Sequence, residues 1–142
     1  MTRCRLCGGP VGLLGQLGTR KHYLCRTMKT TDIIRKALWF LKKGWMQYQL
    51  TDDDGRYCAI GALSMAISGD PRDWSGPRYA LIAGACRRIV KANQLFQHEN
   101  DPAWDAVVSW NNNVNRTQAQ IIRGFEKALR LGMARRGKAL DK

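Results

Sequence analysis

The sequence is short of acidic residues, of histidine and of long hydrophobic runs, and these shortages exclude several classes of protein. The longest mostly apolar run, Tyr57 to Ile67, is shorter than the ~20 residues that a helix needs to cross a bilayer. The N-terminus lacks the apolar core of about 7–15 residues that a secretory signal contains, and the five cysteines are an odd number. We therefore expect a cytoplasmic protein without membrane contact, whose paired cysteines bind metal rather than form disulfides.

The shortage of acids leaves a strong positive charge that is concentrated at the two ends of the chain. There are 24 Lys and Arg against 11 Asp and Glu, which gives a net charge of +13 over 142 residues. Residues 1–43 contain ten basic residues and one acid, residues 122–142 contain seven and two, and the segment between them is close to neutral. This pattern is typical of a scaffold that presents a cationic surface to a polyanion. Basic ends that only improve solubility, or that bind acidic proteins, are the alternative.

Cysteine and histidine near the N-terminus have the spacing of a zinc site. Cys4 and Cys7 are followed by two glycines, as in a turn where two thiolates converge on one metal ion. Two short strands, expected at residues 11–14 and 21–24, would bring the end of this segment back beside the turn. The pattern predicts one Zn²⁺ ion bound by Cys4, Cys7, His22 and Cys25.

This segment resembles a zinc ribbon with one departure. A second knuckle would place another cysteine three residues after Cys25, where this chain has Met28. We therefore expect His22 to be the fourth ligand, and the alternatives are His98 or a site that has lost its metal. A redox-active cysteine pair is disfavoured, because the Gly-Gly-Pro sequence after Cys7 prevents the helix that such a pair begins.

From Thr30 onward the apolar residues recur at helical spacing, which predicts a mainly α-helical body of about five helices behind the N-terminal zinc-bound β-hairpin. The first helix is expected to have its N-cap at Thr31 or Asp32 and to stop at Gly44, and the second is a buried helix over about 57–67. The third is expected to start at Ser75-Gly76-Pro77, and the fourth to run from Asp101-Pro102 to about Trp110. The fifth is expected to begin with a capping box formed by Thr117 and Gln120. In the third helix, Arg87, Arg88 and Lys91 are expected to face away from the apolar stripe. The expected divisions are a zinc-ribbon-like hairpin (1–28), a helical domain (29–131) and a basic C-terminal tail (132–142).

Two blocks within the helical part carry a resemblance. The first block is Asp54-Gly55-Arg56-Tyr57-Cys58-Ala59-Ile60-Gly61-Ala62-Leu63, and the second combines Trp110-Asn111 with Arg116-Thr117 and Ile121. Through these blocks, over about residues 31–131, the chain resembles a small helical family of uncharacterised function from actinobacteria and their phages. The resemblance implies a helical fold but no particular activity. Because metal clips are common additions on phage proteins, it also implies a phage protein that works in the cytoplasm of a bacterial host.

Cys58 is the residue in these blocks that most resembles a catalytic group. It is expected at a helix N-terminus, where the helix dipole lowers the pKa of a thiol and favours a nucleophile. However, only His22 and His98 could act as general bases, and the small residues around Cys58 are typical of close helix packing. We therefore predict that Cys58 is a packing residue and that the protein is not an enzyme.

The remaining polar residues of the blocks have structural interpretations as well. Trp110 is expected in the core, and the asparagine run that follows it is expected to form a turn between two helices. The acidic run at residues 52–54 lacks the ligand spacing of an EF-hand loop. We expect it to form a turn in which the acids pair with Arg56 or cap the next helix.

These observations predict a non-enzymatic, zinc-containing protein that binds DNA, RNA or a nucleoprotein machine of the host. The expected contacts are Arg3, Arg5, Arg20, Lys21, Tyr23, Arg26, Lys29, Arg135, Arg136 and Lys138. One alternative is a phage inhibitor that acts on a host protein or defence system by protein–protein contact, as anti-CRISPR proteins do. Another is an enzyme that uses Cys58 as a nucleophile.

The first testable expectation is one zinc ion per chain. Structural zinc in small finger peptides has an apparent binding free energy of roughly 10–16 kcal/mol, which implies full occupancy. Elemental analysis of the purified protein measures the content, and a value below about 0.2 zinc per chain would contradict the site. A Cys7→Ser variant purified in parallel should lose the metal, because it removes one of the four ligands.

Overall fold

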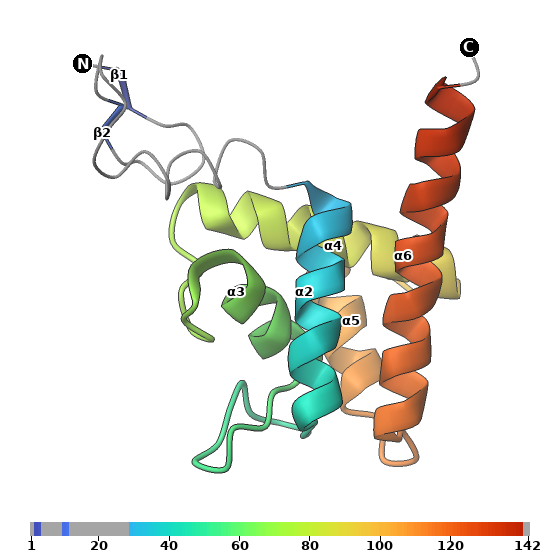
Figure 1. The fold of residues 1–142 in the computed structure, drawn as a ribbon. Helices are drawn as coiled ribbons and strands as arrows, with labels where there is room; N and C mark the ends of the chain where they lie inside the picture. The colour runs from blue at the N-terminus through green and yellow to red at the C-terminus, as the bar shows by residue number, and fades with distance from the viewer. Residues whose placement is uncertain (1, 4–9, 12–28, 141–142) are drawn as a thin grey trace.

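The computed structural model describes the backbone of residues 2–3, 10–11 and 29–140 and the side chains of residues 29–133. Five helices make up most of this part, with one antiparallel pair of two-residue strands, in which Thr2 lies opposite Val11 (Figure 1). The elements are β1 (Thr2–Arg3), β2 (Pro10–Val11), α2 (Thr30–Lys43), α3 (Ala59–Ser68), α4 (Pro77–Asn93), α5 (Ala103–Asn111) and α6 (Gln118–Leu140). Because most of the described residues lie in helices, the mainly helical class predicted from the sequence is confirmed. No helix in the described part is long and apolar enough to cross a membrane.

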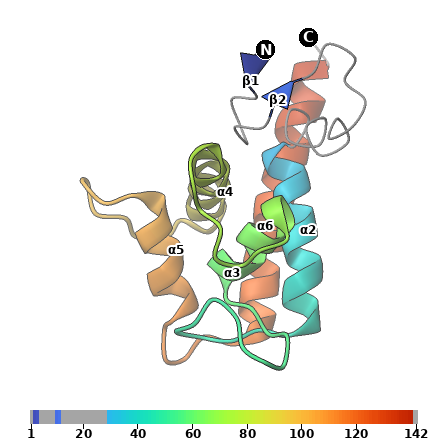
Figure 2. The ribbon, with the colours of Figure 1, turned by 90° about the vertical axis from the view of Figure 1, so that its left-hand side faces the viewer.

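The first and last of the described helices, α2 and α6, lie side by side, and the other three described helices pack around them (Figures 1 and 2). The side-chain amide of Gln118 donates to the carbonyl oxygen of Leu41 at 2.9 Å, so the start of α6 lies beside the end of α2. The two helices are therefore antiparallel. Helix α3 packs against α2, while α4 packs against α6 and α5 packs against α4. The core that they enclose is apolar, and its largest fully buried side chains include Phe125, Ile33 and Leu63.

Three helix ends lie where the sequence predicts them. Gly44 ends α2, and its N–H donates to the carbonyl oxygen of Phe40. Thr117 and Gln120 form the predicted capping box: the Gln120 side chain accepts from the Thr117 N–H at 3.0 Å, and the Thr117 hydroxyl accepts from the Gln120 N–H at 3.3 Å. The start at Pro77 is also confirmed.

Two predicted N-caps are wrong. Helix α2 begins at Thr30, and its cap residue is Lys29, which makes no side-chain hydrogen bond. The Thr31 hydroxyl instead accepts a hydrogen bond from the Arg88 guanidinium at 2.7 Å. Helix α5 begins at Ala103, so Pro102 rather than Asp101 occupies the cap position. At α2, the tertiary contact between Thr31 and Arg88 replaces the local cap that the sequence suggests.

The backbone of α6 continues through Gly132 to Leu140, so the boundary predicted after residue 131 is not a helix end. Gly132 is buried, and a Cβ atom placed on it would lie 2.4 Å from Arg88 Nη1 and 2.6 Å from Thr31 Oγ1. The prediction that Arg88 faces away from the core is wrong, because Arg88 is half-buried at this crossing. The glycine therefore provides space for the guanidinium between three helices rather than ending a helix.

A second glycine of α6 brings the helix close to an aromatic ring. A Cβ atom on Gly124 would lie 2.4 Å and 2.5 Å from Trp110 Cζ2 and Cη2. The indole of Trp110 stacks on Phe125 at a centroid distance of 6.3 Å. Trp110 is 8% exposed, which confirms its predicted place in the core.

We predict that Gly124→Ala lowers the free energy of unfolding by about 1–3 kcal/mol, because the added methyl overlaps the Trp110 ring. Chemical denaturation followed by circular dichroism measures the change. The matched control is Gly84→Ala, also within a helix, where an added Cβ would meet its nearest atoms at 3.7 Å and 3.8 Å. This control should raise stability by about 0.5–1 kcal/mol through helix propensity. Equal effects of the two substitutions would contradict the close packing at Gly124.

Candidate functional site

An exposed tryptophan surrounded by basic side chains lies on the outer face of α2. Trp39 is 53% exposed, whereas Ile33, Ile34, Ala37, Leu38 and Leu41 of the same helix are buried. The residues three and four positions before and after it are all basic, and such positions are neighbours on a helix surface. These residues, which together with Trp39 are referred to as the Trp39 patch, are Arg35, Lys36, Lys42 and Lys43.

The Trp39 ring is held in place from two sides. The ammonium nitrogen of Lys43 lies 3.6 Å from the centroid of the indole, within the range of a cation–π contact. The edge of the neighbouring Phe40 ring lies against the indole at a centroid distance of 4.9 Å, and Phe40 in turn contacts Tyr57. These contacts orient the ring but leave much of it open to solvent.

The charge of the Trp39 patch is largely unneutralised. Arg35 pairs with Asp32 at 3.2 Å, but both side chains are about half exposed, and such surface pairs contribute little. Within residues 29–133, no acidic side chain forms an ion pair with Lys36, Lys42 or Lys43. The patch therefore combines an accessible aromatic face with three lysines that have no acidic partner among residues 29–133.

A second basic surface lies between α6 and the ends of α4 and α5. A groove of about 380 Å³ is lined by Arg116, Arg123 and Lys127 together with the amides of Asn93 and Gln120, and no lining residue is acidic. The Arg116 side chain is fixed, since its Nε–H donates to the Trp110 carbonyl oxygen at 2.9 Å. An adjoining hollow of about 300 Å³ contains acids instead, among them Asp101 and Asp105 beside His98.

The two sequence blocks meet at one buried asparagine. Asn111 is 2% exposed, and its Oδ1 accepts hydrogen bonds from the Trp45 indole N–H at 2.8 Å and from the Ala59 backbone N–H at 3.0 Å. Its Nδ2 donates to the Met46 carbonyl oxygen at 3.3 Å. Asn111 therefore connects the end of α5 to the start of α3 and to the loop between α2 and α3.

Cys58 is a packing residue in this structure. It is 8% exposed at the N-cap of α3, and its sulfur accepts from the Gly61 N–H at 3.4 Å. Burial raises the pKa of the Cys58 thiol despite this hydrogen bond and its place at a helix N-terminus. Burial also raises the pKa of Cys86 to about 12. Both thiols are therefore protonated at neutral pH, the opposite of what an activated nucleophile requires.

The acidic run forms the turn that the sequence predicts. The carboxylate of Asp52 accepts from the backbone N–H groups of Arg56 and Asp54, each at 3.0 Å, and pairs with the Arg56 guanidinium. The backbone N–H of Arg56 is the main reason why the pKa of Asp52 is lowered. The Asp52 carboxylate is therefore occupied by hydrogen bonds within the turn and by the ion pair with Arg56.

Most of the predicted site residues lie outside the side chains that the structure describes. These are the zinc ligands Cys4, Cys7, His22 and Cys25, and the basic or aromatic residues Arg3, Arg5, Arg20, Lys21, Tyr23, Arg26, Arg135, Arg136 and Lys138. Lys29 is described and exposed at the start of α2. Among residues 29–133, no three His, Cys, Asp or Glu side chains come together as a metal site.

The site residues predicted from the sequence do not include those of the Trp39 patch. Its signal is nevertheless present in the sequence, as a tryptophan with basic residues at every neighbouring helical position in a well-defined helix. The aromatic ring could be taken for a core residue, because the apolar stripe of the same helix includes Leu38 and Leu41 beside it.

A model of a family of unknown function (DUF6197) matches residues 26–131. The chain belongs to this family. The matched range contains both sequence blocks, the Trp39 patch and every lining residue of the groove between α4, α5 and α6, whereas the predicted zinc ligands lie before it. No curated protein and no solved structure matched the chain.

We predict that Cys58 reacts slowly with iodoacetamide at neutral pH, because only the thiolate is nucleophilic and burial raises the pKa of this thiol. Peptide mapping by mass spectrometry should show alkylation of Cys58 only after denaturation or at strongly alkaline pH. Cys86, which is more deeply buried, is the internal control and should react no faster. Rapid alkylation of Cys58 alone in the native protein would revive the nucleophile interpretation.

Proposed function

We propose that this protein is a non-enzymatic nucleic-acid-binding protein that holds single strands on the Trp39 patch. The observation that carries the proposal is the exposed indole of Trp39 among four basic side chains on one rigid helix. Proteins that bind single strands combine cations for the phosphates with aromatic rings on which bases stack. The net charge of +13 favours the same partner.

The arrangement suits a single strand better than a duplex. A base can stack on the open face of Trp39 only if it has left its own base stack, whereas the lysines can contact any phosphate. The patch consists of one indole and four cations, and both stacking on an indole and contacts to phosphates are possible with any base sequence. We therefore expect affinity with little sequence preference and with strong dependence on salt.

The basic groove lined by Arg116, Arg123 and Lys127 supports this proposal as a second place for phosphates. A nucleic-acid strand that contacts both the Trp39 patch and this groove would bind more tightly than a strand that contacts only one of them. We further propose that the zinc-bound N-terminal segment and the basic end of α6 extend the contact, in a phage-encoded protein that acts in the host cytoplasm. The absence of a thiolate at Cys58 supports the non-enzymatic part of the proposal.

A second candidate is an inhibitor that docks on a host protein. It is favoured by two exposed apolar side chains outside the basic surfaces, Phe96 at 77% and Val114 at 82% exposure. This candidate predicts a stable complex with a host protein and weak binding to naked nucleic acid. Salt-dependent binding of an oligonucleotide therefore separates the two proposals.

We predict that Trp39→Ala weakens binding of a dT12 oligonucleotide roughly tenfold without changing the slope of log K against log salt, since stacking is lost while charge is kept. Fluorescence anisotropy at several salt concentrations measures both quantities. Because Trp39 is exposed, the melting temperature should stay near that of the wild type. Unchanged affinity would show that the indole takes no part in binding.

The charge of the patch is tested separately. Lys42→Glu should weaken binding and reduce the salt slope by roughly 0.7 for each phosphate of the single strand that the variant no longer neutralises. The matched control is Arg87→Glu, which makes the same change of charge at an exposed position of α4 outside both basic surfaces. If both substitutions act equally, only the overall charge matters. If the wild-type protein fails to bind DNA or RNA at low salt, the proposed function is wrong.

A further inference from the structure

We infer that a cleft on the neutral side of the protein binds a single nucleobase, an inference that rests on the proposed function and adds a base-binding site to it. The cleft has a volume of about 270 Å³ and lies between the loop after α2, the loop before α4 and helix α5. Three aromatic side chains line it, Tyr48, Trp74 and Trp104. It is referred to below as the aromatic cleft.

Two walls of the aromatic cleft are tryptophan rings set nearly at right angles. The centroids of Trp74 and Trp104 are 5.4 Å apart and their planes make an angle of 83°. The ring of Tyr79 stacks on Trp104 at 5.7 Å, but Tyr79 does not line the cleft. Trp104 is therefore supported from outside, while a flat ligand could stack on one wall and meet the edge of the other.

Tyr48 is held beside the cleft in a backbone conformation that an L-residue with a large side chain rarely adopts. Its φ angle is +68°, and its ring is 71% exposed, so burial of the ring does not explain the conformation. Its backbone N–H donates to Asn112 Oδ1 at 2.8 Å, and its hydroxyl donates to the Asn112 carbonyl oxygen at 3.0 Å. Such conformations persist where the surrounding structure holds them, and they occur preferentially at ligand sites.

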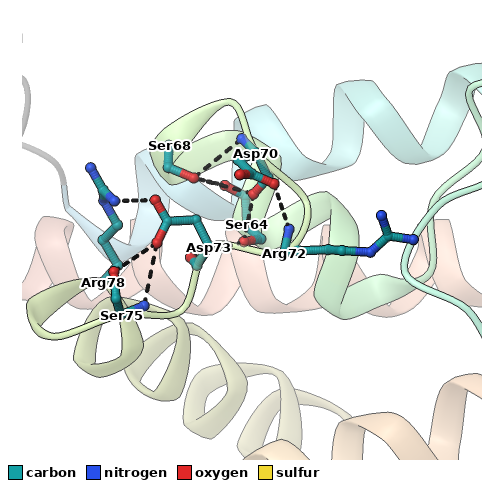
Figure 3. A network of polar contacts seen from close by, with 7 residues as sticks. All are labelled: Ser64, Ser68, Asp70, Arg72, Asp73, Ser75 and Arg78. Carbon is teal, nitrogen blue, oxygen red and sulfur yellow. Dashed lines mark hydrogen bonds and ion pairs between the residues drawn. The ribbon is translucent and has the colours of Figure 1, made fainter.

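The loop that carries Trp74 is also held in place by polar contacts (Figure 3). The buried Ser64 hydroxyl donates to the carbonyl oxygens of Asp70 and Asp73, at 2.8 Å and 3.2 Å. The Asp73 carboxylate accepts from the Ser75 side chain and pairs with Arg78 at the start of α4. The wall formed by Trp74 therefore belongs to an ordered loop, which lowers the entropy lost when a ligand binds.

The lining chemistry selects a neutral planar ligand with a polar edge. No lining residue of the aromatic cleft is charged, which disfavours phosphate groups and free cations. Gln49 and Asn112 bring amide groups to the lining, and among the described hydrogen bonds neither the Gln49 amide nor Asn112 Nδ2 has a partner. A nucleobase has this combination of a flat apolar face and hydrogen-bonding edges, and amide side chains are suited to such edges. The volume is near the lower end of ligand pockets, so it suits a base rather than a whole nucleotide.

The experiment uses nucleosides, which lack phosphate and therefore do not depend on the basic surfaces. The chain contains five tryptophans, so the indole N–H region of a ¹⁵N-correlation spectrum has one signal for each, assignable with Trp→Phe variants. Titration with adenosine, guanosine, cytidine and uridine should shift the signals of Trp74 and Trp104 in a saturable way. The signal of Trp110, which lies outside the cleft lining, should stay in place.

Tyr48→Gly is the sharpest variant, because glycine adopts a φ of +68° without strain. It should weaken nucleoside binding at least tenfold while the melting temperature is kept or raised. The matched control is Phe96→Ala, which removes an aromatic ring that is 77% exposed and does not line the cleft. This control should change nucleoside affinity less than twofold.

The outcomes separate this inference from the proposed function. If dT12 binding depends on Trp39 but no nucleoside shifts the signals of Trp74 and Trp104, the inference is wrong and the proposed function stands. Equal effects of Tyr48→Gly and Phe96→Ala on nucleoside affinity would overturn the inference in the same way. If nucleosides bind the cleft but no oligonucleotide binds, the proposed function fails and the site is one for free nucleosides.

Discussion

The hydrogen bonds of one buried carboxamide, that of Asn111, connect elements that are far apart in the sequence. The Trp45 indole and the Ala59 backbone N–H converge on its Oδ1, and the Gln47 side chain donates to its backbone oxygen at 3.0 Å. Removing this side chain would leave two donors unpaired, at roughly 1–3 kcal/mol for each buried group. The loop after α2, the N-terminus of α3 and the position of Tyr48 therefore all depend on the end of α5.

The sequence predicts well what neighbouring residues decide and poorly what distant residues decide. The capping box at Thr117 and the stop at Gly44 follow from local chemistry, and both are present. Thr31 has the properties of a cap, but Arg88, 57 residues away, takes its hydroxyl. The asparagine run has the composition of a turn, and no local signal shows that Asn111 is buried with partners 52 and 66 residues away.

The same distinction applies to the candidate site. Counting Lys, Arg, Asp and Glu along the chain favours a binding site at its two ends. Such a count does not show which face of a helix each charged residue occupies. The Trp39 patch is visible only when residues 35 to 43 are placed around a helix whose opposite face is buried. The aromatic cleft could not be predicted, because its three rings come from separate segments and one depends on an unusual backbone angle.

The antiparallel pairing of α2 with α6 also has a consequence for synthesis of the chain. The hydrogen bond from Gln118 to Leu41 spans 77 residues, so the first of the described helices to leave the ribosome packs against the last. Until α6 is made, the apolar stripe of α2 can be covered only in part, by α3 and α4. Contacts of such long range slow folding and prolong the exposure of apolar surface. Folding of this helical body is therefore completed only after its C-terminal helix has been synthesised.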